Sequence, residues 1–248
     1  ALKAAAAAGH RLVFATGRNW PEIYPFLWDM GFSGLVGSNG AYAEVDGEVI
    51  FNDKFTAEEV ADIAAWMEEK GGDSFWSTEK ELHPIGRYMD LFRNVGGEYE
   101  RSGDWSIFLD QVEPHLREGL PETASKLTFF LPKSTGVTLD EVQEKLGEDY
   151  SLVAGWSKKN HGASGEVTSK GTNKSVGIAK VAEHFGVPLD EVIAIGDGGN
   201  DVEMLAAVGE GIAMGNGNDA AKAAADRVTK DLHEDGLAHA FRQAGLID

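Results

Sequence analysis

A run of four apolar residues, Val192 to Ile195, limits the possible folds of this chain more than any other feature. No polar residue interrupts the run, which is typical of a strand that is buried on both faces of a sheet. Strands of this kind occur in parallel sheets with helices on both sides. The segments before it, Lys174 to about Phe185, and after it, through Met204 and Leu205, both have helical character. The run therefore predicts an α/β protein with a parallel sheet.

The same alternation of strand and helix recurs in the first and last thirds of the chain. The segments that we expect to be strands are short apolar runs bounded by turns: Arg11 to Phe14, Gly34 to Gly37 and Gly211 to Met214. The segments that we expect to be helices are 1–8, 21–31, an alanine-rich stretch after Asp219, and a last helix from Glu234 or Asp235. Together these segments predict one α/β core.

The middle of the chain mixes strands and helices in another order, which is typical of an α+β domain. Two capping boxes, Thr56 with Glu59 and Thr138 with Glu141, predict the start of a helix each. The strand-like segments here are Trp105 to Leu109, Lys126 to Leu131 and Tyr150 to Ala154. We therefore expect a core domain over 1–52 and 162–248, interrupted by an inserted α+β domain over 53–161.

The composition is that of a globular protein and excludes several functions. The chain has 22 Lys and Arg against 41 Asp and Glu, and the resulting charge of −19 repels nucleic acids and anionic membranes. No apolar stretch has the roughly 20 residues of a membrane-spanning helix. The chain has no cysteine, which excludes disulfides, thiolate catalysis and zinc–thiolate sites. Its 7 histidines show no metal-ligand spacing, so the sequence supports no zinc site. We expect a cytoplasmic protein without nucleic-acid or membrane partners, and its oligomeric state is not predictable from these features.

A cluster of polar residues, Asp197-Gly198-Gly199-Asn200-Asp201, follows the apolar strand directly. In open parallel sheets, ligands bind beyond the carboxyl ends of the strands. Two carboxylates and an amide in so small a volume favour a cation, and Mg²⁺ prefers one or two carboxylates together with a substrate phosphate. The alternative is an ordinary turn in which Asp201 caps the next helix.

Two further features could bind phosphate. Thr16-Gly17-Arg18 follows the first expected strand and leads to a helix start, where backbone N–H groups favour an anion. The alternative is a plain turn. Lys174 lies in the first turn of its helix, where a bound phosphate would offset the unfavourable interaction of a cation with the helix dipole. The alternative is a solvated surface lysine, and Lys170 is a competing candidate that we expect to be exposed.

These motifs resemble the haloacid dehalogenase superfamily, and more narrowly its Cof-like phosphatases. The segments that carry the resemblance are Ala15-Thr16-Gly17-Arg18, Ser38-Asn39-Gly40, Gly171-Thr172-Asn173-Lys174, Gly196-Asp197-Gly198-Gly199-Asn200-Asp201 and Ala213-Met214-Gly215-Asn216. The resemblance covers nearly the whole chain and is most specific in the last third. It implies a Rossmann-like parallel-sheet core with an inserted α+β cap, and Mg²⁺-dependent hydrolysis of phosphate esters.

The resemblance also implies a role for each matching residue. Thr16 and Lys174 would be catalytic: Thr16 would hydrogen-bond the transferring phosphoryl group, and Lys174 would neutralise its charge. The other residues expected to bind phosphate or substrate are Gly17, Arg18, Asn39 and Asn200. Asp197 would ligate Mg²⁺, and Asp201 would support the metal through water or indirect hydrogen bonds. The expected partner is a small phosphorylated metabolite, such as a sugar phosphate or a phosphorylated cofactor.

One departure from the family is serious. The family's Asp-x-Asp-Gly-Thr segment, with the nucleophile and the acid/base, is absent from residues 1–248 and would lie just upstream of Ala1. In this family the segment ends a central strand, whose loss would leave buried backbone groups without partners. We therefore expect the natural polypeptide to continue upstream. The alternatives to a phosphatase are a phosphomutase of the same superfamily and a catalytically inactive phosphate-binding or regulatory module.

In this family the cap selects the substrate. Within and beside the expected cap, the polar or aromatic candidates for substrate contact are Lys80, His83, Arg87 and Trp156. His161 is expected near the junction with the core. The sequence does not discriminate among these candidates. A second segment, Gly215-Asn216-Gly217-Asn218, is expected to be a turn that could pack beside the acidic cluster.

Overall fold

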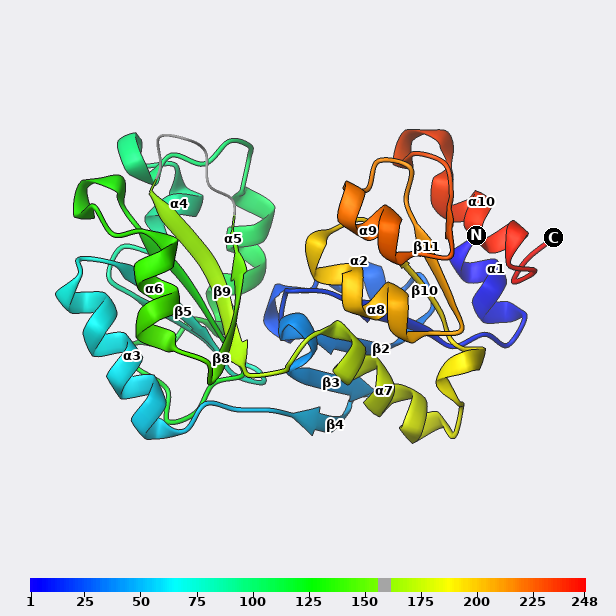
Figure 1. Ribbon diagram of the computed structural model, residues 1–248, viewed down its shortest axis with the longest axis horizontal. Helices are drawn as coiled ribbons and strands as arrows, with labels where there is room; N and C mark the ends of the chain where they lie inside the picture. The colour runs from blue at the N-terminus through cyan, green and yellow to red at the C-terminus, as the bar shows by residue number, and fades with distance from the viewer. Residues whose placement is uncertain (156–161) are drawn as a thin grey trace. The chain divides into compact units, whose positions relative to one another are not determined.

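The computed structural model describes residues 1–155 and 162–248 (Figure 1). The chain divides into two compact units. Unit 1 consists of Ala1–Arg18, Tyr24–Phe51 and Asn173–Asp248, and unit 2 of Asn19–Ile23 and Asn52–Thr172. The assignment of 53–161 as an inserted cap stays a prediction. No helix in the described ranges has both the length and the apolar character needed to cross a membrane.

Unit 1 contains two small sheets. The first has the order β1-β2-β3-β4, with β1 (Leu12–Ala15) parallel to β2 (Phe32–Gly37) and β2 antiparallel to β3 (Tyr42–Val45). Strand β4 (Glu48–Asn52) completes it. The second sheet is wholly parallel and consists of β10 (Ile193–Gly196), β11 (Glu210–Ala213) and β12 (Arg227–Val228). The apolar run at Val192 is thus a strand of a parallel sheet, as predicted.

Helix α7 (Lys174–Phe185) connects the two sheets of unit 1 through its packing. It contacts β2 and β3, and it also contacts helix α8 (Val202–Ala207), which packs against β10 and β11. Ile178 accordingly packs both with Val36 of β2 and with Ala194 of β10. The remaining helices of unit 1 are α1 (Leu2–Ala7), α2 (Pro25–Trp28), α9 (Asp219–Ala224) and α10 (Gly236–Gln243). Helices α1 and α10 lie side by side, through a cluster that contains Ala5 and Phe241 (Figure 1).

An apolar cavity of about 530 Å³ lies between strands β1 and β10. Among the described strands, β1 pairs only with β2 and β10 only with β11, so each has one edge without a strand partner. The cavity is lined by both strands and by residues of α7, including Ile178 and Phe185. Side chains of the two strands also share clusters: Leu12 with Ile195, and Ala15 with Ala194. The two sheets therefore face each other across a slot between their free edges.

Unit 2 is built on a five-stranded antiparallel sheet in the order β6-β5-β7-β9-β8. Its strands are β5 (Asp73–Ser77), β6 (Leu82–Ile85), β7 (Lys126–Leu131), β8 (Tyr150–Ala154) and β9 (Ala163–Ser169). Its helices are α3 (Ala57–Glu69), α4 (Asp90–Arg93), α5 (Ser106–Val112) and α6 (Leu139–Leu146). Helices α3 and α6 pack on one face of the sheet, and α4 and α5 on the other.

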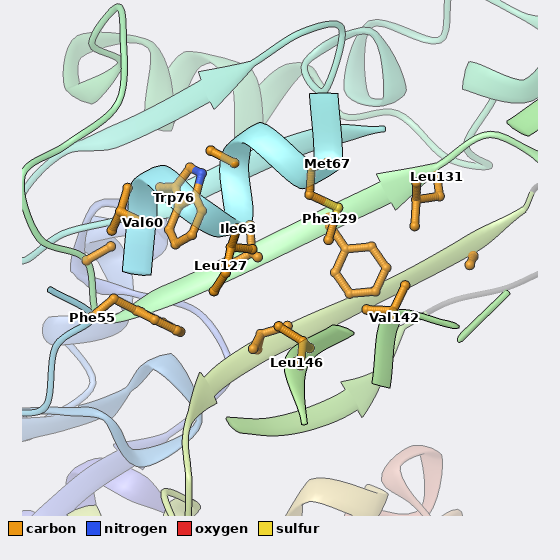
Figure 2. Packing of buried hydrophobic residues seen from close by; sticks show 14 residues of the cluster. Phe55, Val60, Ile63, Met67, Trp76, Leu127, Phe129, Leu131, Val142 and Leu146 are labelled. Atoms are coloured by element: carbon orange, nitrogen blue, oxygen red, sulfur yellow. The ribbon is translucent and has the colours of Figure 1, made fainter. Parts of the chain in front are cut away.

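An apolar cluster of 14 buried residues lies between this sheet and helices α3 and α6 (Figure 2). Leu127, Phe129 and Leu131 alternate along β7 toward it, as the two-residue period of a strand requires. Phe130 points to the opposite face, where it packs with Phe75 and the α4–α5 side. The strand is thus buried on both faces, which explains why its last three residues, Phe129 to Leu131, are all apolar.

Both predicted capping boxes are confirmed. The Thr56 hydroxyl accepts from the Glu59 N–H at the start of α3, and Thr138 does the same with Glu141 at the start of α6. The predicted strands 126–131 and 150–154 and the helix 174–185 also match the observed bounds.

The expected strand from Trp105 to Leu109 was wrong, because this segment is helix α5. The Asp104 carboxylate accepts from the Ser106 N–H and starts the helix. Trp105, Phe108 and Val112 follow at helical spacing and pack on the α4 cluster.

The expected continuous helix over 21–31 was also wrong. A 3₁₀ turn, Trp20–Glu22, is capped by Asn19, and α2 begins only at Pro25. Tyr24 is extended because the proline ring after it disfavours the helical conformation.

Candidate active site

Three predicted site segments lie at the carboxyl ends of strands β1, β2 and β10: the loop from Thr16, the 3₁₀ turn Ser38–Gly40, and the loop from Asp197. Backbone hydrogen bonds join the first two. The Ser38 N–H donates to Arg18 O (2.9 Å), and the Asn39 N–H donates to Thr16 O (3.2 Å). The parallel pairing of β1 and β2 therefore brings Thr16 beside Asn39, because carboxyl ends of parallel strands meet at one edge.

The turn at Asn39 has an unusual backbone. Ser38 and Asn39 have φ values of 49° and 53°, and Gly40 has a φ of 101°. Left-handed conformations at non-glycine residues are strained and cluster at functional sites. A Cβ atom on Gly40 would lie 1.9 Å from Asn173 O, so only glycine permits the turn to touch the N-terminus of α7. The turn is thereby fixed against the residue that precedes Lys174.

The two sheets of unit 1 are linked at this end by a side-chain hydrogen bond. Asn200 Nδ2 donates to Asn39 Oδ1 at 3.0 Å. The bond connects the loop after β10 to the turn after β2, and Asn39 is buried. Two of the residues expected to bind phosphate are thus in contact.

Lys174 is the first residue of α7, and its side chain is buried against Asp201. The Lys174 Nζ lies 2.5 Å from Asp201 Oδ1, and each side chain is only 6% exposed. Asp201 Oδ2 accepts from the backbone N–H groups of Asp197 (2.9 Å) and Gly198 (2.8 Å). Both oxygens of Asp201 therefore have protein partners, which suits a supporting position better than direct ligation of a metal.

Asp197 differs from Asp201 in being exposed. Its Oδ2 accepts from Asn216 Nδ2 at 3.4 Å, and its backbone oxygen accepts from the Asn218 N–H at 3.0 Å. The segment 215–218 therefore packs beside the acidic cluster, one of the arrangements expected for it. Asn216 was not among the candidate site residues, although its place in the matching motif was a usable signal.

The donor set at Asp197 fits one part of a magnesium site. In the described ranges, no group of three or more His, Asp or Glu side chains could hold a metal ion together. Mg²⁺ retains several waters and is commonly bound by one or two carboxylates plus substrate phosphate, so one exposed carboxylate is compatible with it. Asp197 can supply that carboxylate, and Asn200 lies three residues further on the same loop.

The other candidates lie in different surroundings. The Arg18 guanidinium stacks on the Tyr24 ring at 5.3 Å. Lys170 is 63% exposed, as expected, and its Nζ lies 3.8 Å from Glu148 Oε2. Lys80 and His83 line one cavity of about 560 Å³ within unit 2, whereas the Arg87 Nε bonds Asp90 Oδ2 at 2.9 Å. Trp156 and His161 lie outside the described residues.

Comparison with known proteins identifies the family. A family model described as haloacid dehalogenase-like hydrolase matches residues 1–241. The chain belongs to this family. The predicted resemblance to the haloacid dehalogenase superfamily and its Cof-like branch is therefore confirmed, and so is the α/β fold class.

Relatives of this haloacid dehalogenase-like hydrolase include several phosphatases. Phosphatase YwpJ of Bacillus subtilis (strain 168) is 24% identical over 264 residues, covering 98% of this chain and 90% of the relative. The 5-amino-6-(5-phospho-D-ribitylamino)uracil phosphatase YitU of the same organism is 34% identical over 140 residues, 46% of this chain and 51% of the relative. The solved structure of the subclass IIB sugar phosphatase BT4131 has a TM-score of 0.75 and 29% identity, covering 99% of this chain and 90% of that one. The chain is an enzyme of the phosphoric monoester hydrolase class.

Proposed function

We propose that this protein is a Mg²⁺-dependent phosphatase of small phosphorylated metabolites, either sugar phosphates or phosphorylated cofactors. The observation that most supports this proposal is that two hydrogen-bonded groups of predicted site residues meet at one end of unit 1. Thr16, Asn39 and Asn200 form the first group, and Lys174, Asp201 and Asp197 the second. The contact of Gly40 with Asn173 joins the two groups.

The first group supplies hydrogen-bond donors for a phosphoryl group. The Thr16 hydroxyl oxygen accepts from the Arg18 N–H at 3.2 Å, so its own proton can be donated to a phosphoryl oxygen. The Gly17 backbone, without a side chain, permits close approach. Donors fixed before the reaction stabilise the charge of the transition state without reorganisation.

The second group supplies charge. Lys174 neutralises the phosphoryl oxygens as a point charge, and Asp201 holds its ammonium group in place. Asp197 holds Mg²⁺, while Asp201 fixes the loop by accepting from the backbone N–H groups of Asp197 and Gly198. When bound, Mg²⁺ polarises the phosphoryl group and neutralises charge that develops on its oxygens.

The nucleophile is proposed to lie upstream of Ala1, on a strand that fills the slot between β1 and β10. Strand β1 is parallel to β2, strand β10 is parallel to β11, and both have an edge without a strand partner among the described strands. A strand in the slot would end between Thr16 and Asp197. Its aspartate would attack phosphorus as the bond to the ester oxygen breaks, and the substrate alcohol would leave with a proton from the acid/base of the same segment. Water would then cleave the aspartyl-phosphate, which releases inorganic phosphate and restores the aspartate.

The substrate class rests on the relatives and on unit 2. The structural neighbour BT4131 is a sugar phosphatase, and YitU acts on a phosphorylated ribitylaminouracil. We assign substrate selection to the inserted cap. Of the cap candidates, Lys80 and His83 share a cavity, which makes them the pair to substitute first.

Phosphate release from p-nitrophenyl phosphate by the natural polypeptide tests the proposal. We expect release with Mg²⁺ and none with a chelator. An intact mass above 26.6 kDa is expected for that polypeptide, and a mass at this value would contradict the upstream strand. No release would favour the inactive phosphate-binding module. Transfer of the phosphoryl group back to substrate, seen by product analysis, would instead identify a phosphomutase.

A further inference from the structure

The loop from Gly215 to Asn218, which joins β11 to α9, is held closely between two other segments. A Cβ atom on Gly217 would lie 2.9 Å from Met214 O and 3.3 Å from the Cα of Asp197. On the other side, a Cβ atom on Gly215 would lie 2.5 Å from the Asp231 backbone nitrogen. These contacts are with backbone atoms, which cannot move aside as the end of a flexible side chain can. The loop is therefore fixed against both the Asp197 loop and the segment 230–232.

Asn216 forms a bridge between these two segments. Its Oδ1 accepts from the Leu232 N–H at 3.0 Å, and its Nδ2 donates to Asp197 Oδ2 at 3.4 Å. A backbone N–H can only donate, so the carbonyl oxygen of the Asn216 amide must face Leu232. The amide NH₂ group is thereby directed at the Asp197 carboxylate.

We propose that Asn216 is a positioning residue that orients the Asp197 carboxylate for Mg²⁺. The inference rests on the proposed function, because it assumes that Asp197 holds the metal. With Oδ2 bonded to Asn216 and the backbone oxygen bonded to the Asn218 N–H, the rotation of Asp197 is restricted and Oδ1 is presented to the cation. Partners that orient metal ligands in this way raise metal affinity, and their loss commonly reduces it about 10–100-fold.

Calorimetric titration of the full chain with Mg²⁺ alone, without substrate, tests the inference. Asn216→Ala is expected to raise the dissociation constant for Mg²⁺ about 10-fold. Asn94→Ala is the matched control. Asn94 is also an exposed asparagine with two hydrogen bonds, to Gly103 O and from the Arg101 N–H, but it lies in unit 2. It is expected to lower the melting temperature and leave the dissociation constant unchanged.

The outcomes separate this inference from the proposed function. If the unsubstituted chain binds Mg²⁺ and Asn216→Ala binds it equally well, Asn216 does not position Asp197. An equal loss of affinity in Asn94→Ala would also overturn the inference, since it would reflect general destabilisation. If the unsubstituted chain binds no Mg²⁺, the metal site fails, and the inference fails with it. Should Asn216→Ala not fold, Asn216→Ser is titrated with the same expectation.

Discussion

The Nζ atom of Lys174 lies 2.5 Å from Oδ1 of Asp201, and both side chains are almost wholly buried. Lys174 starts helix α7, so its charge is at the end of the helix where the dipole disfavours a cation. Asp201 offsets both this interaction and the loss of hydration. Without Asp201, both the helix dipole and the buried surroundings would disfavour the positive charge of Lys174. The ion pair therefore keeps this charge in place.

Removing one charge of the Lys174–Asp201 ion pair should destabilise the protein more than removing both charges. Asp201→Leu leaves the Lys174 ammonium buried without its partner, and we expect a loss of about 3–5 kcal/mol in the free energy of unfolding. The double variant Lys174→Met/Asp201→Leu should lose less than Asp201→Leu alone, and therefore less than the sum of the single variants. Urea denaturation of all four proteins measures the coupling, and additive losses would contradict it.

Asp197→Asn should separate function from stability. The side chain is exposed, so the free energy of unfolding should change by no more than about 0.5 kcal/mol. If Asp197 holds Mg²⁺, phosphatase activity should fall about 100-fold or more, since a metal contributes several kcal/mol to transition-state stabilisation. Asp219→Asn, at an exposed aspartate in the first turn of α9, is the control and should retain activity. If Asp197→Asn retained as much activity as Asp219→Asn, Asp197 would not be a residue of the active site.

Gly40→Ala should be far more damaging than Gly47→Ala. Both glycines have positive φ angles, 101° and 84°, so alanine costs about 1–2 kcal/mol at each. At Gly47 the added Cβ meets nothing within 4 Å, but at Gly40 it would lie 1.9 Å from Asn173 O. Separating the turn from α7 should add about 1–3 kcal/mol or more. Thermal unfolding compares the variants, and similar melting temperatures would show that the close approach is dispensable.

The capping box at Glu59 should make the stability of the protein depend on pH. The Thr56 backbone N–H, with help from the Thr56 and Tyr150 hydroxyls, lowers the pKa of Glu59 below its ordinary value. A lowered pKa stabilises the fold above the unfolded-state value, and this contribution is lost as the pH falls through the folded-state pKa. Glu59→Gln should therefore cost about 0.3–1 kcal/mol at pH 7 and less at an acidic pH at which Glu59 is protonated. Urea denaturation at both values measures this, with Glu58→Gln as control. A loss that is independent of pH would rule out the charge as its cause.

Much of the fold was predictable from local sequence. The helix Lys174–Phe185 and the strand Lys126–Leu131 have the predicted bounds because the spacing of their apolar residues agrees with which side chains are buried. The prediction of a strand from Trp105 to Leu109 failed because the local sequence pattern did not agree with how the segment is buried. Its few aromatic residues resemble a strand in composition, and only their packing on the α4 side shows the helical period. Pro25 was a signal against a continuous helix that the prediction did not use.

The residues of the candidate site were named from the sequence and their roles stay predictions, but their pairings were not predictable. Asn39 and Asn200 are 161 positions apart, and only the arrangement of two sheets around α7 brings them together. The burial of Lys174 is likewise a tertiary effect, because its sequence position alone is compatible with a solvated lysine. Motif resemblance supplied what local periodicity could not, namely which distant loops share one end of the core.

Strands β1 and β10 each have one edge without a strand partner among the described strands, and a strand in the slot between them would also protect the protein from aggregation. Rows of N–H and C=O groups without partners are templates that can recruit strands from other molecules. A chain in which no strand filled this slot would be prone to edge-to-edge association at high concentration. Its charge of −19 opposes such encounters through mutual repulsion, most strongly at low ionic strength. The solubility of such a chain would then depend on ionic strength, and added salt should promote precipitation.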